Sequence, residues 1–310
     1  MNTPSHFETV LQSGRFAVTA EIAPPKSASA AVLKRAACAL RAHVDALNIT
    51  DNQAAVVRMS SIAACVHVQQ EGVETVLHMT CRDRNRIGLQ SDLLGAWSLG
   101  IRNVLLLTGD PPHVGNHPEA VPVFDVDSVA LSRITDDMRR KSVLMNGDAM
   151  KNAPRFFIGV GDNPYAGALE SRLARFKRKL EAGADFVQTQ PIFDIRRFRE
   201  WVGVLKDSGL LERVHLLAGI LPVKSYGALC RISRIPGMAV PDELLERFRA
   251  VPEQLQPALG IEVASHTIEQ LRQIKSLSGI HVMAINWYEC VPELLECTGL
   301  RVADRVVATV

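Results

Sequence analysis

The sequence has few aromatic residues, no long hydrophobic run and no excess of charge of either sign. Phe, Trp and Tyr make up only 5% of the 310 residues, so we expect a core that is mostly aliphatic. Lys and Arg number 35 against 33 Asp and Glu, and the net charge of +2 argues against nucleic-acid binding through a broad basic surface. No stretch reaches the roughly 18 apolar residues of a membrane-spanning helix, so we expect no membrane partner.

The cysteine pattern and the N-terminal residues indicate a reducing compartment. The six cysteines are scattered and form no C-x-x-C pair, and no clustered Cys and His spacing supports a metal site. Residues 1–14 lack the apolar core of a secretory signal. Scattered cysteines suit free thiols, so we expect a cytoplasmic protein without a bound metal.

Short apolar runs alternate with helical patterns along the whole chain. Continuous apolar runs are typical of parallel strands that are buried on both faces. Eight strand–helix alternations predict an α/β fold, a single (β/α)8 TIM barrel over residues 1–310. The rival is a doubly wound open sheet, but no G-x-G-x-x-G follows the first strand. The predicted strands cover residues 16–22, 44–50, 75–80, 103–107, 156–160, 185–189, 215–218 and 281–285.

The least regular stretch covers about residues 111–155, between the fourth and fifth predicted strands. It contains several prolines and glycines around one helix-like piece at 126–139. We therefore predict an enlarged loop, which in a barrel would lie on the catalytic face. The other predicted helices cover residues 30–42, 89–99, 169–180, 198–205 and 244–248.

Polar residues at the ends of the strands are candidates for a site, because these ends form the active face of a barrel. Glu21 lies in an apolar strand, where desolvation would raise its pKa and suit it to act as a general acid. Asp110 follows Gly109, which allows a close backbone approach to a ligand. Both carboxylates are read equally well as polar groups that cap a helix or a loop. His78 is more typical of a hydrogen-bonded structural histidine, and Lys179 of a solvated helix face, although one cation there could meet a phosphate.

Several short blocks add a more specific pattern, and they follow one another over nearly the whole chain. The first, Glu21–Lys26, reads E-x-x-P-P-K. The later blocks are His78–Cys81, Gly100–Arg102 with Leu107–Pro111, Lys179–Asp185 with Thr189–Asp194, Gly219–Val223, and Gly260–Ile261 through Ala284–Asn286. In this joint order they resemble the methylenetetrahydrofolate reductase family. The length resembles that of the family's catalytic barrel alone, without the regulatory extension of the eukaryotic enzymes.

The resemblance implies a flavin-bearing barrel that reduces 5,10-methylenetetrahydrofolate to 5-methyltetrahydrofolate, with FAD as cofactor and NADH or NADPH as co-substrate. Glu21 matches the family's general acid, since protonation of N10 drives the methylene bridge to open. Asp110 matches an aspartate beside the flavin and the pterin, and Gln190 matches a glutamine that contacts folate. We also expect a homo-oligomer.

The resemblance further implies two sets of binding residues. The substrate-binding set is Asp110, Gln190, Ile232 and Ile285. The cofactor-binding set is Thr50, His78, Thr108, Gly109, Asp110, Phe124, Asn163, Arg172, Arg175 and Lys179.

Some positions depart from the family pattern. Thr108 stands where well-known bacterial members have an arginine, Ile232 where they have a phenylalanine that stacks on the substrates, and Ala228 where they have a glutamine. Arg172 and Arg175 replace an aspartate and an asparagine. Two alternatives therefore stay open. The protein could oxidise 5-methyltetrahydrofolate in a one-carbon pathway, or it could be a folate- or flavin-binding subunit that receives electrons from a protein partner.

Overall fold

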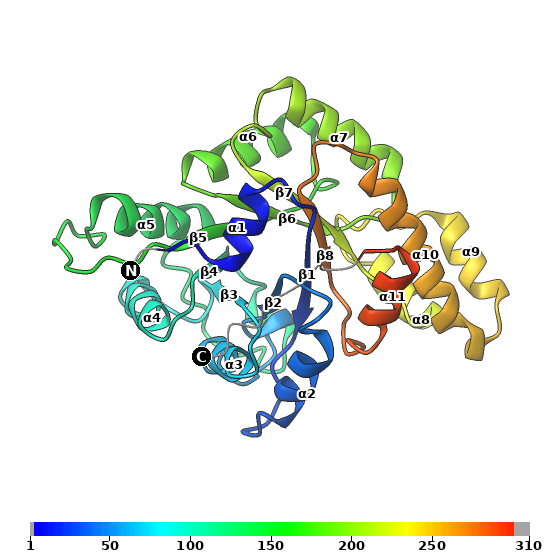
Figure 1. The fold of residues 1–310 in the computed structure, drawn as a ribbon, viewed down its shortest axis with the longest axis horizontal. Helices are drawn as coiled ribbons and strands as arrows, with labels where there is room; N and C mark the ends of the chain where they lie inside the picture. The colour runs from blue at the N-terminus through cyan, green and yellow to red at the C-terminus, as the bar shows by residue number, and fades with distance from the viewer. Residues whose placement is uncertain (1–2, 301–310) are drawn as a thin grey trace.

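The computed structural model describes residues 3–300, in which eight parallel strands close into a barrel surrounded by helices (Figure 1). The strands pair in sequence order and β1 pairs with β8, which confirms the predicted (β/α)8 TIM barrel of the α/β class. The strands are β1 (Ala17–Ile22), β2 (Ala46–Ile49), β3 (Thr75–Thr80), β4 (Asn103–Leu107), β5 (Phe157–Asp162), β6 (Phe186–Pro191), β7 (His215–Ile220) and β8 (Gly279–Val282).

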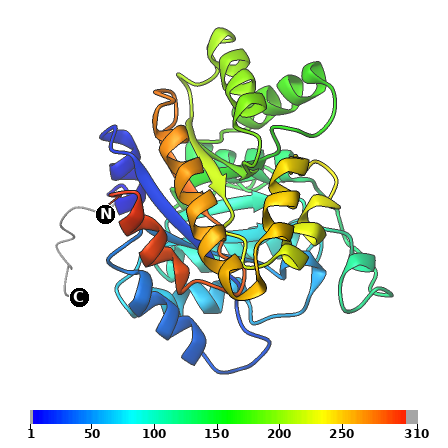
Figure 2. The same ribbon diagram turned by 90° about the vertical axis from the view of Figure 1, so that its right-hand side faces the viewer.

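The helices alternate with the strands. The connection between β7 and β8 contains several helices where most of the others contain one. The α-helices are α1 (His6–Gln12), α2 (Ala31–Leu40), α3 (Ser61–Gln69), α4 (Arg86–Ser98), α5 (Ser128–Lys141), α6 (Leu169–Glu181), α7 (Ile195–Asp207), α8 (Tyr226–Ser233), α9 (Asp242–Ala250), α10 (Gln256–Arg272) and α11 (Cys290–Cys297). The short 3-10 helices are η1 (Gln53–Ala55), η2 (Pro112–Val114) and η3 (Glu253–Leu255). After β7, α8 and α9 pack together beside α10, as the yellow and orange segments of Figure 2 show.

The outer helices form because their apolar residues recur at helical spacing. In α7, Phe198, Trp201, Val202 and Leu205 are buried and lie on one face, which packs on the strands. The helix begins at Asp194, whose carboxylate accepts a hydrogen bond from the backbone N–H three residues later. None of the helices in the described part of the chain is both long and apolar enough to cross a bilayer.

The interior of the barrel changes from apolar to polar along the strands. At the amino-terminal end, α1 closes the barrel, and Phe7 packs with Phe157 and Phe186 at ring-centroid distances of 5.9 and 5.2 Å. Gly159 is required there, because a Cβ atom would lie 2.2 Å from the Phe186 ring. The next inward-facing residues are mostly polar. Three phenylalanines thus fill the closed end of the barrel, and polar groups line the interior toward the open end.

Two segments differ from the sequence-based expectation. The last strand begins at Gly279 and ends at Val282, so the predicted strand 281–285 is displaced, and Ile285 lies beyond the sheet. Glycine disfavours a strand in isolation, but here a Cβ atom at Gly279 would lie 2.2 Å from the carbonyl oxygen of Ala17 on β1. The segment 111–155 contains η2, the regular barrel helix α5, and a short antiparallel bridge between Val143 and Ala149.

Candidate active site

A pocket of about 320 Å³ opens at the carboxyl ends of the strands, at the polar end of the barrel. Residues of β1, β3, β4, β5, β6 and β8 and of the segment after β2 line it, because parallel strands end at the same face. The pocket, which we call the mouth pocket, brings together seven of the residues predicted from the sequence. They are Glu21, Thr50, His78, Thr108, Gly109, Asp110 and Gln190.

Glu21 is a largely buried acid of the mouth pocket, with a side chain that is 10% exposed. The side-chain Nε2 of Gln53 donates to its Oε1 at 3.0 Å, and Nε2 of His281 lies 3.6 Å from its Oε2. Burial raises the pKa of Glu21, but the contact with His281, the nearby imidazole of His78 and the hydrogen bond from the Gln53 amide together outweigh it. The pKa of Glu21 therefore lies below its usual value, and the predicted rise was wrong.

A buried chain of polar side chains crosses the barrel beneath the pocket. The Thr19 hydroxyl lies 2.9 Å from Nδ1 of His281 and accepts a hydrogen bond of 3.1 Å from Gln188. The amides of Gln188 and Asn48 bond to each other, at 2.7 and 3.3 Å. The amide of Asn48 then lies 2.9 Å from Nε2 of His78. The ring of His281 thus lies between the Thr19 hydroxyl on its Nδ1 side and the Glu21 carboxylate on its Nε2 side.

His78 is held neutral by its surroundings. Burial lowers its pKa to about 4, and the opposing attraction of the Glu21 charge is too small to restore it. A neutral Nε2 can accept the hydrogen bond that the Asn48 amide offers. His78 is therefore a hydrogen-bonded group of the barrel interior that also lines the mouth pocket.

The segment after β4 presents Asp110 at the rim of the pocket. Gly109 has a left-handed backbone, with φ of +93°, and a Cβ atom there would lie 3.0 Å from Cβ of Thr80. Arg82, whose side chain is 3% exposed, donates to the carbonyl oxygen of Asp110 at 3.2 Å. The Thr108 hydroxyl accepts from the backbone N–H of Ser128 at 3.1 Å. The backbone of residues 108–110 is therefore fixed by its neighbours, while the Asp110 side chain itself is exposed.

Thr50 contributes to the mouth pocket a hydroxyl group that no other described residue satisfies. The residue is 2% exposed, and its hydroxyl finds no hydrogen-bond partner among the described residues. A buried hydroxyl without a partner costs free energy unless a bound molecule satisfies it. Together with His78 and Asp110, it gives the mouth pocket donors and acceptors at several sides, which fits the polar ring system of a flavin.

The three predicted cations of α6 do not line the mouth pocket. Lys179 donates to the carbonyl oxygen of Gly161, and its Nζ lies 3.7 Å from Oδ1 of the buried Asp162. Burial raises the pKa of Asp162 and lowers that of Lys179, and their mutual attraction opposes both shifts. Arg172 donates to a backbone carbonyl of the β5–α6 loop and lies 5.1 Å from the ring of Trp201.

The remaining predicted cofactor residues also take part in contacts within the protein. Arg175 reaches the carbonyl oxygens of Asn163 and Ala166, at 3.5 and 3.4 Å. The side-chain oxygen of Asn163 accepts from the backbone N–H of Tyr165 at 3.0 Å. Phe124 has a positive φ of 40° and packs against the core. A role of these residues toward a cofactor stays a prediction.

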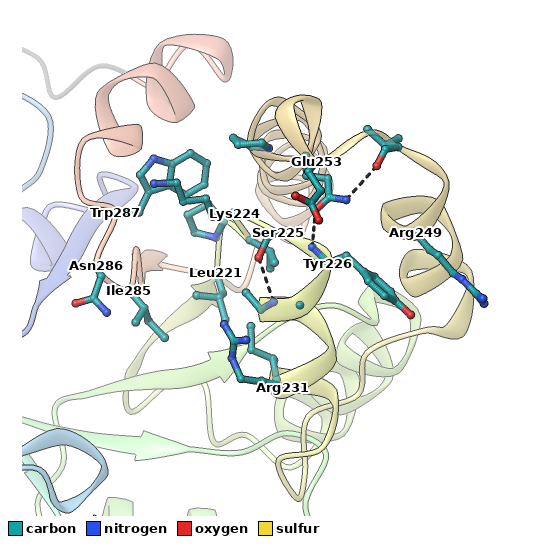
Figure 3. Close-up of a pocket in the computed structure, with 18 of the residues that line it drawn as sticks. Leu221, Lys224, Ser225, Tyr226, Arg231, Arg249, Glu253, Ile285, Asn286 and Trp287 are labelled. Carbon is teal, nitrogen blue, oxygen red and sulfur yellow. Dashed lines mark hydrogen bonds between the residues drawn. The ribbon is translucent and has the colours of Figure 1, made fainter. Parts of the chain in front are cut away.

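A larger cleft of about 1250 Å³ lies beside the barrel mouth, between α8, η3 and the loop after β8 (Figure 3). It contains the two predicted apolar substrate contacts, Ile232 from α8 and Ile285 from the loop after β8. Nζ of Lys224 lies 5.6 Å from the centroid of the Trp287 ring, and both residues line the cleft. A third pocket of about 240 Å³ shares Glu21 with the mouth pocket and Ile285 with this cleft, so it lies between the two.

Comparison with known proteins agrees with this geometry. The sequence model described as methylenetetrahydrofolate reductase matches residues 6–299. The chain belongs to the methylenetetrahydrofolate reductase family. It is 27% identical over 250 residues to methylenetetrahydrofolate reductase 2 of Schizosaccharomyces pombe, which covers 75% of this chain and 37% of that protein. It is 23% identical over 239 residues to the 5,10-methylenetetrahydrofolate reductase of Pectobacterium carotovorum, covering 75% and 72%.

The chain spans little more than a third of several relatives within the methylenetetrahydrofolate reductase family. The probable methylenetetrahydrofolate reductase (NADPH) of Caenorhabditis elegans is 26% identical over 243 residues, 78% of this chain and 34% of that protein. Among solved structures, a Clostridium thermocellum protein that binds two copies of 5-methyl-5,6,7,8-tetrahydrofolic acid superimposes with a TM-score of 0.64. The two are 12% identical, over 94% of this chain and 96% of that one, so the likeness shows the fold alone.

Sequence reasoning missed several residues that surround the acid in this member of the methylenetetrahydrofolate reductase family. Thr19, Asn48 and His281 lie in the polar chain, and Gln53 contacts Glu21 directly. One signal was available for Thr19, because it precedes Glu21 by two positions and so shares its face of the strand. The predicted strand began at His281, whereas in the structure His281 is the third residue of β8 and lies inside the barrel.

Proposed function

We propose that the protein catalyses flavin-mediated hydride transfer that interconverts 5,10-methylenetetrahydrofolate and 5-methyltetrahydrofolate. The observation that carries the proposal is the position of Glu21. It is a nearly buried carboxylate at the junction of two pockets, with a partner on each oxygen. An oxidoreductase acting on tetrahydrofolate derivatives is what family membership supports, and Glu21 supplies the proton chemistry that such a reaction needs.

The proton belongs on N10 of the folate. Opening the methylene bridge breaks the bond from the methylene carbon to N10, leaves an iminium at N5, and requires a proton for N10. Glu21 gives that proton in the reductive direction and takes it back when the bridge closes. Asp110 and Gln190, which line the same pocket, would hold the pterin ring by hydrogen bonds.

A second candidate function is the same reaction run toward oxidation of 5-methyltetrahydrofolate, which begins from a charged Glu21. The lowered pKa leaves a carboxylate in the free protein, and a carboxylate is ready to accept the N10 proton. Acceptance is the step that belongs to oxidation of 5-methyltetrahydrofolate. For reduction, the carboxylate must first gain a proton before it can protonate N10.

We assign FAD as the cofactor, with its ring system in the mouth pocket. Thr50, His78, Thr108 and Asp110 would hold the ring, and the unpartnered Thr50 hydroxyl supports this fit. The flavin would supply the two-electron chemistry, while the protein orients the folate and excludes water. The volume of about 320 Å³ accommodates the ring end, so the rest of the cofactor would extend outside the mouth pocket.

We assign the larger cleft to the outer part of the folate and to NADH or NADPH as electron donor. Lys224, Arg231 and Arg249 line it against the single acid Glu253, a balance that suits anionic ligands. Trp287 provides an aromatic face in the same cleft as Ile232, the position where the family's stacking ring is absent. The alternative donor is a protein partner, for which Ile232 and Ala228 are the motivating positions.

Two measurements test this function. The absorption spectrum of the purified protein should show flavin bands, and anaerobic mixing with NADH or NADPH should bleach them rapidly. Addition of 5,10-methylenetetrahydrofolate should then restore the bands as folate is reduced. Bleaching by neither nucleotide, with retained bleaching by 5-methyltetrahydrofolate, would assign the electrons to a protein partner. A protein that binds neither flavin nor folate contradicts the proposal.

A further inference from the structure

The segment that follows β2 has an unusual backbone. Asn52, Ala54 and Ala55 have positive φ angles of 44°, 55° and 55°. Asparagine adopts this left-handed region readily, but the Cβ atom of alanine is crowded there. Two successive alanines in this conformation persist only where the surroundings hold them, and such backbone often serves to place a functional group.

Neighbouring loops hold this segment in place. Nη2 of Arg82 donates to the carbonyl oxygen of Asn52 at 3.2 Å, and the side chain of Asn52 accepts from the backbone N–H of Arg58 at 2.9 Å. Gly115 lies directly against Ala55, since a Cβ atom at 115 would be 1.9 Å from the Ala55 carbonyl oxygen. The segment is thus fixed from the loops after β3 and β4, which also shape the mouth pocket.

The result of this arrangement is the direction of the Gln53 side chain. Its Nε2 donates to Oε1 of Glu21 at 3.0 Å, while His281 faces the other carboxylate oxygen. Gln53 and Glu21 both line the mouth pocket and the neighbouring pocket of about 240 Å³. Gln53 therefore forms part of the wall between the two pockets and fixes the carboxylate within that wall.

We propose that Gln53 is a positioning residue for Glu21, a role that rests on the acid–base function proposed above. Its amide stabilises the charged carboxylate and sets its orientation toward the substrate nitrogen. An amide neither gives up nor takes a proton at neutral pH, so Gln53 acts through Glu21 alone. Removal of the amide should raise the pKa of Glu21 and leave one oxygen unheld.

The first test follows the carboxyl group itself and needs no turnover. Infrared difference spectra recorded over a pH titration would give the midpoint of the Glu21 band, identified by its loss in Glu21→Gln. The midpoint should move upward in Gln53→Ala. The matched control is Gln12→Ala, which removes an amide–carboxylate bond of the same 3.0 Å length on the exposed face of α1 and should leave the midpoint unchanged. An unmoved midpoint in Gln53→Ala overturns the proposal.

The second test separates the two half-reactions. Gln53→Ala should slow folate reduction about tenfold or more, as expected for one hydrogen bond to a charged group. Flavin reduction by the nucleotide should keep its rate, because it requires no proton on N10. Equal slowing of both half-reactions, or of neither, contradicts the positioning role. If the wild-type protein shows no folate turnover, the proposed function fails, while the infrared result still decides whether Gln53 holds Glu21.

The third test displaces the segment without touching Gln53. Gly115→Ala places a methyl group against the Ala55 carbonyl and should shift the Glu21 midpoint in the same direction as Gln53→Ala. Gly203→Ala, on α7 with open space around it, is the matched control and should have no effect on the midpoint. A midpoint unchanged by Gly115→Ala would contradict the inferred link between the held backbone and the carboxylate.

Discussion

The carboxylate of Glu21 lies 3.6 Å from Nε2 of His281, across the seam where β1 pairs with β8 and closes the barrel. The ring of His281 is held from its other side by Thr19 at 2.9 Å. Such an arrangement fixes the orientation of the ring and the carboxylate oxygen that it faces. The charge state of the candidate acid is therefore set by the closure of the barrel as well as by its own strand.

Replacement of Glu21 by glutamine should abolish the proton transfer and preserve the fold. Glutamine has nearly the same shape and can still bond to Gln53, so the protein should keep its flavin. Folate turnover should fall by about a hundredfold to ten-thousandfold, the usual range for a general acid or base. The control is Glu269→Gln on the surface of α10, which should retain full turnover. Unchanged turnover in Glu21→Gln contradicts the acid assignment.

Replacement of His281 by asparagine should raise the pKa of Glu21. Burial raises the pKa of Glu21, and the contact with His281 is the largest influence that lowers it. Without this contact, the effect of burial is opposed less strongly and the pKa rises. In the reductive direction, the pH range of folate turnover should extend upward, since the protonated acid survives to higher pH. Stopped-flow folate reduction measured as a function of pH would show this shift. A profile identical to that of the wild-type protein would argue against the contact.

The buried His78 should make the protein less stable in mild acid. The unfolded chain binds a proton with the ordinary pKa of 6.5, whereas the folded protein binds it only near pH 4. Between these values the unfolded state carries more protons, so stability falls as the pH falls through this window, by up to about 3 kcal/mol. Urea unfolding at pH 7, 6, 5 and 4 would measure the loss. The loss should be smaller in His78→Asn and unchanged in His117→Asn, whose side chain is exposed.

Removal of Lys179 should destabilise the barrel wall. Lys179→Met leaves Asp162 buried without its cation, a change that usually costs about 3–5 kcal/mol. Urea unfolding should show a lower midpoint, and the double variant Lys179→Met with Asp162→Leu should recover much of the loss. Lys177→Met on the exposed face of α6 is the matched control. If Lys179→Met unfolds at the wild-type midpoint, the pair contributes nothing to stability.

The sequence predicted the fold and the residues of the mouth pocket because both depend on local patterns. Continuous apolar runs indicated the parallel strands, and polar residues at their ends necessarily meet at one face. The local pattern is therefore sufficient to place Glu21, Thr50 and Asp110 together at the barrel mouth. The last strand was displaced because Gly279 is required by the carbonyl of Ala17, a contact that no local pattern contains.

The rest of the site depends on distant contacts. The predicted rise in the pKa of Glu21 considered burial alone, while His281 and Gln53 reverse the result. Gln53 could not be recognised from its neighbours, since its direction follows from a left-handed backbone held by other loops. The sequence predicted that Lys179 would be solvated or would face a phosphate. In the structure it lies on α6 and pairs with Asp162 of β5.

The seam between β1 and β8 also has a consequence for protein synthesis. Thr19 and His281, which bond at this seam, are 262 positions apart in the chain. A ribosome therefore releases the carboxylate of Glu21 long before its histidine partner. Until that last strand emerges, the polar interior is open to water along one side, and a nascent chain carries the acid without the environment that tunes it.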